Sequence, residues 1–234
     1  MNLLEYIIND YQLASFLVLI FFILSLIASA NVKMTFSKYN KVKSSRGVPA
    51  HVIARQILDS NGLYNIEVVQ TPGNLTDHYD PKKQIVALSS GVFNSVSVGA
   101  IGIAAHECGH AVQHSVGYGP IQVRTAIFPV VNLMSRLWLY VMLIGLFMSL
   151  PFMLDVGIIF FTVVAIFQLV TLPVEFNASR RAMQTISSQN ILDVTEQKGA
   201  RKTLTAAAMT YVMALLLSIA QLLRILAASN RRRR

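Results

Sequence analysis

Four long apolar segments constrain this chain more than any other feature, because each is long enough to cross a lipid bilayer as a helix. They are predicted at residues 13–30, 127–150, 156–174 and 204–228. The second and third are separated only by residues 151–155, where a proline and an aspartate predict the turn of a transmembrane hairpin. The sequence therefore predicts a mostly α-helical, multi-span membrane protein.

The composition agrees with a lipid-facing surface. Of the 234 residues, 54% are hydrophobic and only 13% are charged, against about 25% charged in an average globular protein. The formal net charge of +9 includes the arginine run at residues 231–234, and most other positive charges flank apolar segments. This arrangement suits anionic lipid headgroups. No nucleic-acid-binding motif is found, so the bilayer is an expected partner and nucleic acid is not.

The first and fourth apolar segments each leave an alternative. Residues 28–30 look like a signal-peptidase site, but the preceding segment lacks Lys and Arg, and the apolar run is longer than a usual signal core. An uncleaved anchor is therefore predicted. The fourth segment contains Gln221 and Arg224 near its end. It either crosses the bilayer or lies in the interface with Arg224 extended towards the headgroups.

The region between the first and second segments is the predicted soluble part of the chain. Residues 49–60 have apolar side chains at helical spacing, and Gly62 is a plausible stop. The β-branched runs at 66–70 and 84–88 enclose a segment rich in turn formers and predict a loose hairpin. Residues 95–115 predict an almost wholly apolar helix. A small α/β element is therefore expected beside this helix.

Polar residues interrupt the predicted helix at residues 95–115 in one short stretch, His106-Glu107-Cys108-Gly109-His110. Two histidines four residues apart lie on one helical face, so their nitrogens can bind one ion at about 2.0–2.1 Å. Glu107 then lies beside the ion without binding it and can take a proton from water. The alternative is a pair of satisfied core histidines with no metal.

Nearby residues are poor candidates for a third metal ligand. On a helix Cys108 is turned about 200° from His106, so we interpret it as a small packed residue. His114 lies about 12 Å from His106 along the helix, too far to share the ion with both motif histidines. The extended metzincin pattern requires a histidine where this chain has Val116.

A distant carboxylate is a better candidate, because a catalytic zinc site uses three protein ligands and keeps one position open. The glutamates outside the motif are Glu5, Glu67, Glu175 and Glu196. Glu175 is preferred because it lies at the end of the third apolar segment. The alternative for Glu175 is an ordinary carboxylate at a membrane boundary.

Four blocks of this sequence resemble the bacterial membrane-bound neutral zinc metallopeptidase family, and the resemblance extends over nearly the whole chain. The blocks lie at residues 77–81, 98–111, 172–176 and 210–212. Glu175, with Ala178 three residues later, also resembles the third-ligand helix of the gluzincins. The blocks occur in the family's order and in the same places relative to the apolar segments.

This resemblance implies a zincin-like element around the motif helix, and one zinc ion per chain bound by His106, His110 and Glu175. Glu107 is implied as the general base. Two positions depart from the pattern, because Ser179 and Asn177 stand where related proteins carry an acid. An acid there could orient a ligand histidine, so the partners of the two histidines are left open.

The predicted function is that of an integral-membrane zinc endopeptidase that hydrolyses protein or peptide substrates, membrane proteins among them, near the membrane surface. The alternative is a non-catalytic scaffold or regulator that keeps a metal for structure. Arg180, Arg181 and His78 are candidates for stabilising the oxyanion. A substrate strand could pair with an edge of the expected hairpin at residues 66–88.

The distribution of positive residues predicts a multi-pass protein of the cell membrane with its site facing the cytoplasm. The site's side carries Lys33, Lys38, Lys41, Lys43, Arg46, Arg124, Arg180, Arg181, Lys198, Arg201 and Lys202, and the other side carries Arg224 and residues 231–234. The predicted regions are an anchor (1–31), a metallopeptidase region (32–125), a transmembrane hairpin (126–174), a third-ligand segment (175–203) and a C-terminal helix with a basic tail (204–234).

Overall fold

The computed structural model describes residues 10–233, and the chain forms two compact units. One unit consists of Ser29–Gln122 and Pro173–Met209. The other consists of Met1–Ala28, Val123–Leu172 and Thr210–Arg234. Glu5, one of the glutamates considered above, lies outside the described residues.

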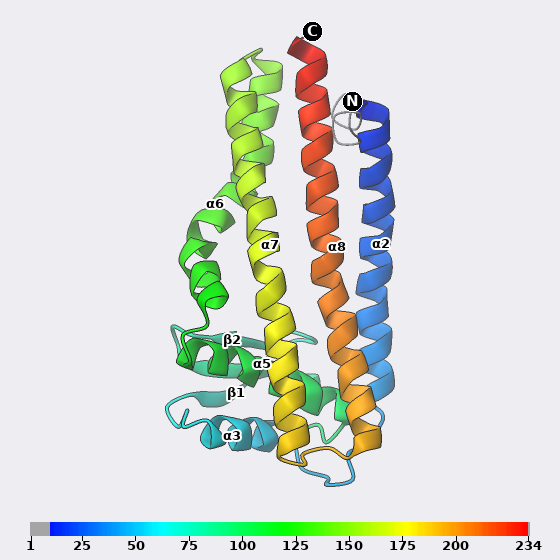
Figure 1. Ribbon diagram of the computed structural model, residues 1–234, viewed down its shortest axis with the longest axis vertical. Coiled ribbons are helices and arrows are strands. Elements are labelled where there is room, and N and C mark those ends of the chain that lie inside the picture. The colour runs from blue at the N-terminus through cyan, green and yellow to red at the C-terminus, as the bar shows by residue number, and fades with distance from the viewer. Residues whose placement is uncertain (1–9, 234) are drawn as a thin grey trace. The chain divides into compact units, whose positions relative to one another are not determined.

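The unit that contains the His-Glu-x-x-His motif has a small sheet packed with short helices (Figure 1). Its complete elements are α3 (Ala50–Ser60), β1 (Glu67–Thr71), β2 (His78–Asp80), β3 (Ile85–Ser89), α4 (Ser90–Phe93) and α5 (Val98–Ser115). The helices α7 (Pro151–Ser188) and α8 (Val194–Arg233) each contribute residues to both units.

The predicted helices of this unit are confirmed, and local capping explains where they begin and end. The helix expected at 49–60 is α3, and Gly62 just beyond it has a φ of +73°, which suits glycine at a helix end. The motif helix is α5. Its N-cap is Ser97, whose hydroxyl accepts a hydrogen bond from Ala100 N at 3.1 Å. The short helix α4 was not expected.

The predicted hairpin between residues 66–70 and 84–88 is wrong. The sheet has the order β1-β3-β2, and β1 pairs with β3 in parallel, with Val69 opposite Ala87. The antiparallel partner of β3 is instead β2, with Tyr79 opposite Val86. The error has a simple cause, because β2 is only three residues long and lies inside the segment interpreted as a turn.

The turn between β2 and β3 shows why the chain reverses there. The carboxylate of Asp80 accepts hydrogen bonds from Lys82 N at 2.9 Å and Lys83 N at 3.1 Å, and Gln84 has a φ of +54°. An aspartate that bonds the backbone two and three residues later is a common turn-forming device. The strands β2 and β3 therefore form the hairpin, and β1 and β2 are the edge strands of the sheet.

The core of this unit is apolar and continuous from α3 through the sheet to α5 and α7. It is centred on fully buried side chains, among them Ile53, Ile57, Leu58, Leu88, Ile101 and Ile186. Burial of each such side chain stabilises the fold by roughly 1.5–3 kcal/mol. This core fixes α5 and α7 against each other, and these are the helices that carry the candidate metal ligands.

The second unit consists largely of segments of four long apolar helices. Within the described residues these are α2 (Tyr11–Tyr39), α6 (Gly119–Phe147), α7 and α8, each long and apolar enough to cross a membrane. Large apolar side chains stay exposed on them, such as Phe16, Leu133 and Ile159. The predicted fold class is confirmed: over residues 10–233 the protein is mostly α-helical, with four candidate membrane-spanning helices and one small sheet.

The turn of the predicted transmembrane hairpin lies earlier than expected. The helix α6 ends at Phe147 and α7 already begins at Pro151, so residues 151–155 are helical. Proline is well suited to the first position of a helix because its missing N–H would have no partner there. The chain reverses at Ser149, whose φ is +54°. Pro129 lies inside α6, and the exposed Arg136 interrupts its apolar surface.

The helices α5 and α7 approach each other tightly at Gly109. A Cβ added there would lie 2.8 Å from the carbonyl oxygen of Ala178, a distance that forces one backbone to move. Only glycine therefore lets the motif helix lie this close to α7. This contact joins the motif on α5 to the segment of α7 that begins with Glu175.

We expect Gly109→Ala to lower the free energy of unfolding by about 1–3 kcal/mol, because the added methyl group overpacks the contact between α5 and α7. The measurement is denaturant unfolding of detergent-purified, metal-free protein followed by circular dichroism. Gly91→Ala is the matched control, since its Cβ would meet only Asn74 Oδ1 at 3.6 Å. Equal stability of the two variants would contradict the tight contact.

Candidate metal centre

Three side chains from two helices converge on one point in the unit that contains the sheet. The helix α5 supplies His106 and His110, and α7 supplies Glu175. One potential ligand atom from each lies within 4.8 Å of the other two. Glu175 Oε2 is 3.2 Å from His106 Nε2 and 3.6 Å from His110 Nε2. The predicted long-range pairing of Glu175 with the motif is present in the structure.

These separations fit a single zinc ion. Ligand atoms at about 2.0–2.2 Å from zinc in a tetrahedral arrangement lie roughly 3.3–3.5 Å apart, which matches the distances from Glu175 Oε2 to both histidines. Glu175 is only 2% exposed and His110 only 7%. A carboxylate buried to this degree requires a cation or strong hydrogen-bond donors beside it. Two nitrogens and one carboxylate oxygen form a typical catalytic zinc donor set.

His110 is oriented by a glutamine that the sequence analysis missed. His110 Nδ1 lies 3.0 Å from Gln113 Oε1, and the side-chain amide of Gln113 donates to Val174 O at 2.8 Å and Asn177 Oδ1 at 3.0 Å. Both amide hydrogens of Gln113 are thus used, so its oxygen must accept from Nδ1–H of His110. The Nε2 lone pair of His110 is then directed at the metal position.

Gln113 has a signal that sequence reasoning could have used. It is a polar residue three positions after His110, on the same helical face of a mostly apolar helix. The structure shows that it is fully buried. Asn177, noted earlier as a departure from the family pattern, holds the amide of Gln113 and also accepts from Arg181 Nε at 2.8 Å. Arg181 therefore supports this network.

His106 has a simpler partner. The hydroxyl oxygen of Ser179 lies 3.1 Å from His106 Nδ1. When Nε2 of His106 is used for a metal, Nδ1 carries the proton and the serine oxygen accepts it. The two positions that depart from the acidic pattern therefore still contact the ligand network, through neutral groups.

Glu107 differs from the ligands in its surroundings. Glu107 as a whole is only 9% exposed, and none of the hydrogen bonds found among the described residues reaches its carboxylate. Burial raises the pKa of Glu107 above the ordinary carboxyl range, and the neighbouring His106 and His110 oppose this shift. A buried carboxylate with unused acceptor capacity beside a metal position can receive a proton.

The rejected ligands lie where the helical geometry predicted. Cys108 is fully buried in the core, and its Sγ lies 3.5 Å from Ala54 O. Burial also raises the pKa of the Cys108 thiol, which disfavours the thiolate that binds metals. His114 contacts the ring of Tyr79, with 5.6 Å between centroids, and does not belong to the ligand group.

The remaining candidates are separate from the ligand group. Glu67 is exposed on β1, and Glu196 accepts a hydrogen bond from Ser45 N at 2.5 Å. His78 is exposed on β2, where its Nδ1 lies 2.9 Å from Thr76 O. Arg180 is exposed on α7 and lines a cavity between α7 and α8.

A His-Glu-x-x-His helix joined by a distant glutamate, in a chain with four candidate membrane-spanning helices, defines a membrane protein with a zinc-peptidase-type centre. The chain belongs to the family described as "Putative neutral zinc metallopeptidase", whose model matches residues 14–230. It is similar to the "Putative membrane protease YugP" of Bacillus subtilis, with 47% identity over 201 residues, 86% of this chain and 89% of the relative. No solved structure matches the chain.

We expect Gln113→Leu to lower zinc affinity by about 10–100-fold, because His110 would lose the group that fixes its tautomer and ring orientation. Competition with a chromogenic chelator measures the affinity. Gln56→Leu is the control, since Gln56 is a half-buried glutamine that bonds to Gln189 away from the centre. Wild-type affinity in Gln113→Leu would show that other contacts orient His110.

Proposed function

We propose that this protein is an integral-membrane zinc endopeptidase that hydrolyses protein or peptide substrates close to the membrane surface. The observation that carries this proposal is the convergence of His106, His110 and Glu175 beside the buried Glu107. The family and its relative support a membrane zinc protease in general terms. One zinc ion per chain is proposed, because the described residues bring together one such group of ligands.

A bound zinc ion would act as a Lewis acid that polarises a peptide carbonyl and lowers the pKa of water. The chain's own contribution is proton transfer at Glu107. Its carboxylate takes a proton from the attacking water while the water oxygen adds to the carbonyl carbon. It then returns that proton to the departing amine nitrogen as the C–N bond breaks. One water is consumed for each bond cleaved.

The strand β2 is the proposed place where a substrate backbone pairs. It is an edge strand of the sheet, and its Tyr79 contacts His114 of the motif helix α5. An extended peptide added to this edge would lie next to α5 and gain main-chain hydrogen bonds without a sequence requirement. The edge proposed from sequence is thus kept, although the strands around it are arranged differently.

Glu107→Gln should lower turnover by about 10²-fold or more, because the amide preserves shape but cannot take the proton. Activity is measured on an unfolded protein substrate, with zinc content measured in the same preparation. Glu107→Gln should keep one zinc per chain, whereas Glu175→Ala should lose it, and Glu67→Ala on β1 serves as the control. Cleavage at the wild-type rate in Glu107→Gln would assign the base elsewhere.

The same assay separates the enzyme from the scaffold alternative. A non-catalytic protein would bind zinc through His106, His110 and Glu175, yet the wild type would cleave no substrate. The unbonded, buried Glu107 favours the enzyme, because a metal kept only for structure has no use for a proton acceptor beside it.

We propose further that the centre faces the cytoplasm. In a Cys108→Ala background, an impermeant maleimide should label Met148→Cys and Arg231→Cys on intact cells, and Lys41→Cys only after permeabilisation. Met148 lies in the exposed turn between α6 and α7, and Lys41 is exposed just after α2. Labelling of Lys41→Cys on intact cells would reverse this orientation. Protection of both Lys41→Cys and Arg231→Cys would place α8 in the interface.

A further inference from the structure

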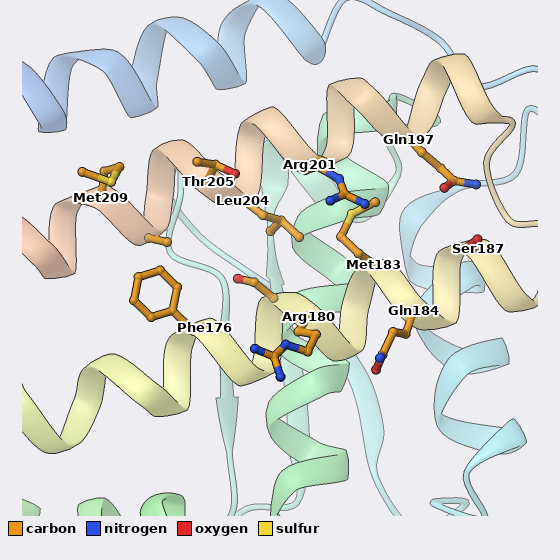
Figure 2. Close-up of a pocket in the computed structure, with 12 residues that line it drawn as sticks. Phe176, Arg180, Met183, Gln184, Ser187, Gln197, Arg201, Leu204, Thr205 and Met209 are labelled. Carbon is orange, nitrogen blue, oxygen red and sulfur yellow. The ribbon is translucent and has the colours of Figure 1, made fainter.

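A groove of about 510 Å³ lies between α7 and α8 in the unit that holds the metal centre (Figure 2). Cavities of about 300–1,000 Å³ are typical of ligand sites. The groove is lined by Phe176, Ser179, Arg180, Met183, Gln184, Ser187, Gln197, Arg201, Leu204, Thr205, Ala208 and Met209. No aspartate or glutamate is among these residues.

The lining changes character along the groove. Figure 2 shows Phe176 and Met209 towards one end, Gln184 and Gln197 towards the other, and the two arginines between them. Phe176 is 43% exposed and Met209 is 37% exposed, so this end of the groove carries accessible apolar side chains. An occupant therefore meets an apolar section directly beside a cationic one.

The two arginines of the groove are available for a ligand. Arg180 and Arg201 are both exposed, and neither has an ion pair or side-chain hydrogen bond with any described residue. Other arginines of this unit do have partners, such as Arg55 with Asp59 at 2.8 Å. Two guanidinium groups in a concave surface without carboxylates attract an anion, and a carboxylate can accept two parallel hydrogen bonds from one guanidinium.

The groove is connected to the metal centre through one residue, Ser179. Ser179 lines the groove, and the same hydroxyl lies 3.1 Å from Nδ1 of His106. Phe176, at the apolar end, follows Glu175 in the chain. A ligand in the groove is therefore separated from His106 by the side chain of Ser179, on the Nδ1 side of the imidazole ring.

We propose that this groove is a specificity subsite for substrates with an acidic residue next to an apolar one. Arg180 and Arg201 supply the positive charge that attracts the carboxylate, and Phe176 with Met209 contacts the apolar neighbour. This inference rests on the proposed peptidase function. A phospholipid headgroup has similar chemistry, but the contact of the groove wall with His106 favours a peptide.

The test uses two rhodamine-labelled dodecapeptides that differ only at the centre, with Phe-Glu-Glu in one and Phe-Lys-Lys in the other. Their binding to zinc-loaded Glu107→Gln protein in zwitterionic detergent is measured by fluorescence anisotropy. The acidic peptide should bind at least about tenfold more tightly, as expected for charge-assisted hydrogen bonds. Adding Arg180→Glu and Arg201→Glu should reverse the preference, and Arg180→Gln with Arg201→Gln should abolish it.

Lys202→Glu is the matched control, because Lys202 is an exposed cation beside Arg201 that does not line the groove. It should leave the preference intact, and zinc content should be unchanged in every variant. Equal binding of both peptides to the parent protein would overturn the inference. A preference for the acidic peptide that survives Arg180→Glu with Arg201→Glu would also overturn it. The same holds if these two substitutions change only the binding of anionic phosphatidylglycerol.

Incubation of the wild type with the two peptides separates this inference from the proposed function. Faster cleavage of the acidic peptide supports both. Selective binding of the acidic peptide without any cleavage supports the groove and contradicts the peptidase. Cleavage of both peptides at equal rates, with equal binding, supports the peptidase and contradicts the groove.

Discussion

The backbone contact between Gly109 of α5 and Ala178 of α7 is the constraint on which the metal centre depends. A glycine on the motif helix lets a second helix lie against it, with Ala178 O 2.8 Å from the position a Cβ would take. That approach places Glu175 within 3.2–3.6 Å of both histidines. The apolar core stabilises the same approach from α3 and the sheet. The packing of the core and the formation of the metal centre therefore depend on the same contact between α5 and α7.

The two ligand histidines are oriented without the acidic residues that related proteins carry at the positions of Asn177 and Ser179. Gln113, braced by Val174 O and Asn177, fixes His110, and Ser179 lies against His106. A neutral acceptor orients an imidazole through the same N–H as a carboxylate does, but it adds no negative charge to the ring. The acidic residues are thus replaced by neutral groups that keep the geometry while changing the electrostatics.

The features that the sequence predicted correctly are those governed by local spacing. Two histidines four residues apart share a helical face wherever the helix lies, and long apolar runs reveal candidate spans by composition alone. Glu175 was preferred only for its place at the end of the third apolar segment, with support from the family resemblance, because a contact between helices far apart in sequence has no local signal. The sheet was misassigned for the same reason, since β2 has three residues and the pairing of β1 with β3 is not local. Gln113 was visible only as a polar residue three positions after His110, and the backbone and side-chain groups that hold its amide lie on another helix.

The neutral groups behind the histidines leave the charge of the centre to two carboxylates, Glu107 and Glu175. Both are buried and close together, so two negative charges without a cation are costly there. The two positive charges of a divalent ion balance the charges of the two carboxylates, whereas a site without the ion must bind protons instead. Filling the centre is thus an exchange of protons for metal. The amount of loaded protein therefore depends on the acidity around it as well as on the supply of the ion.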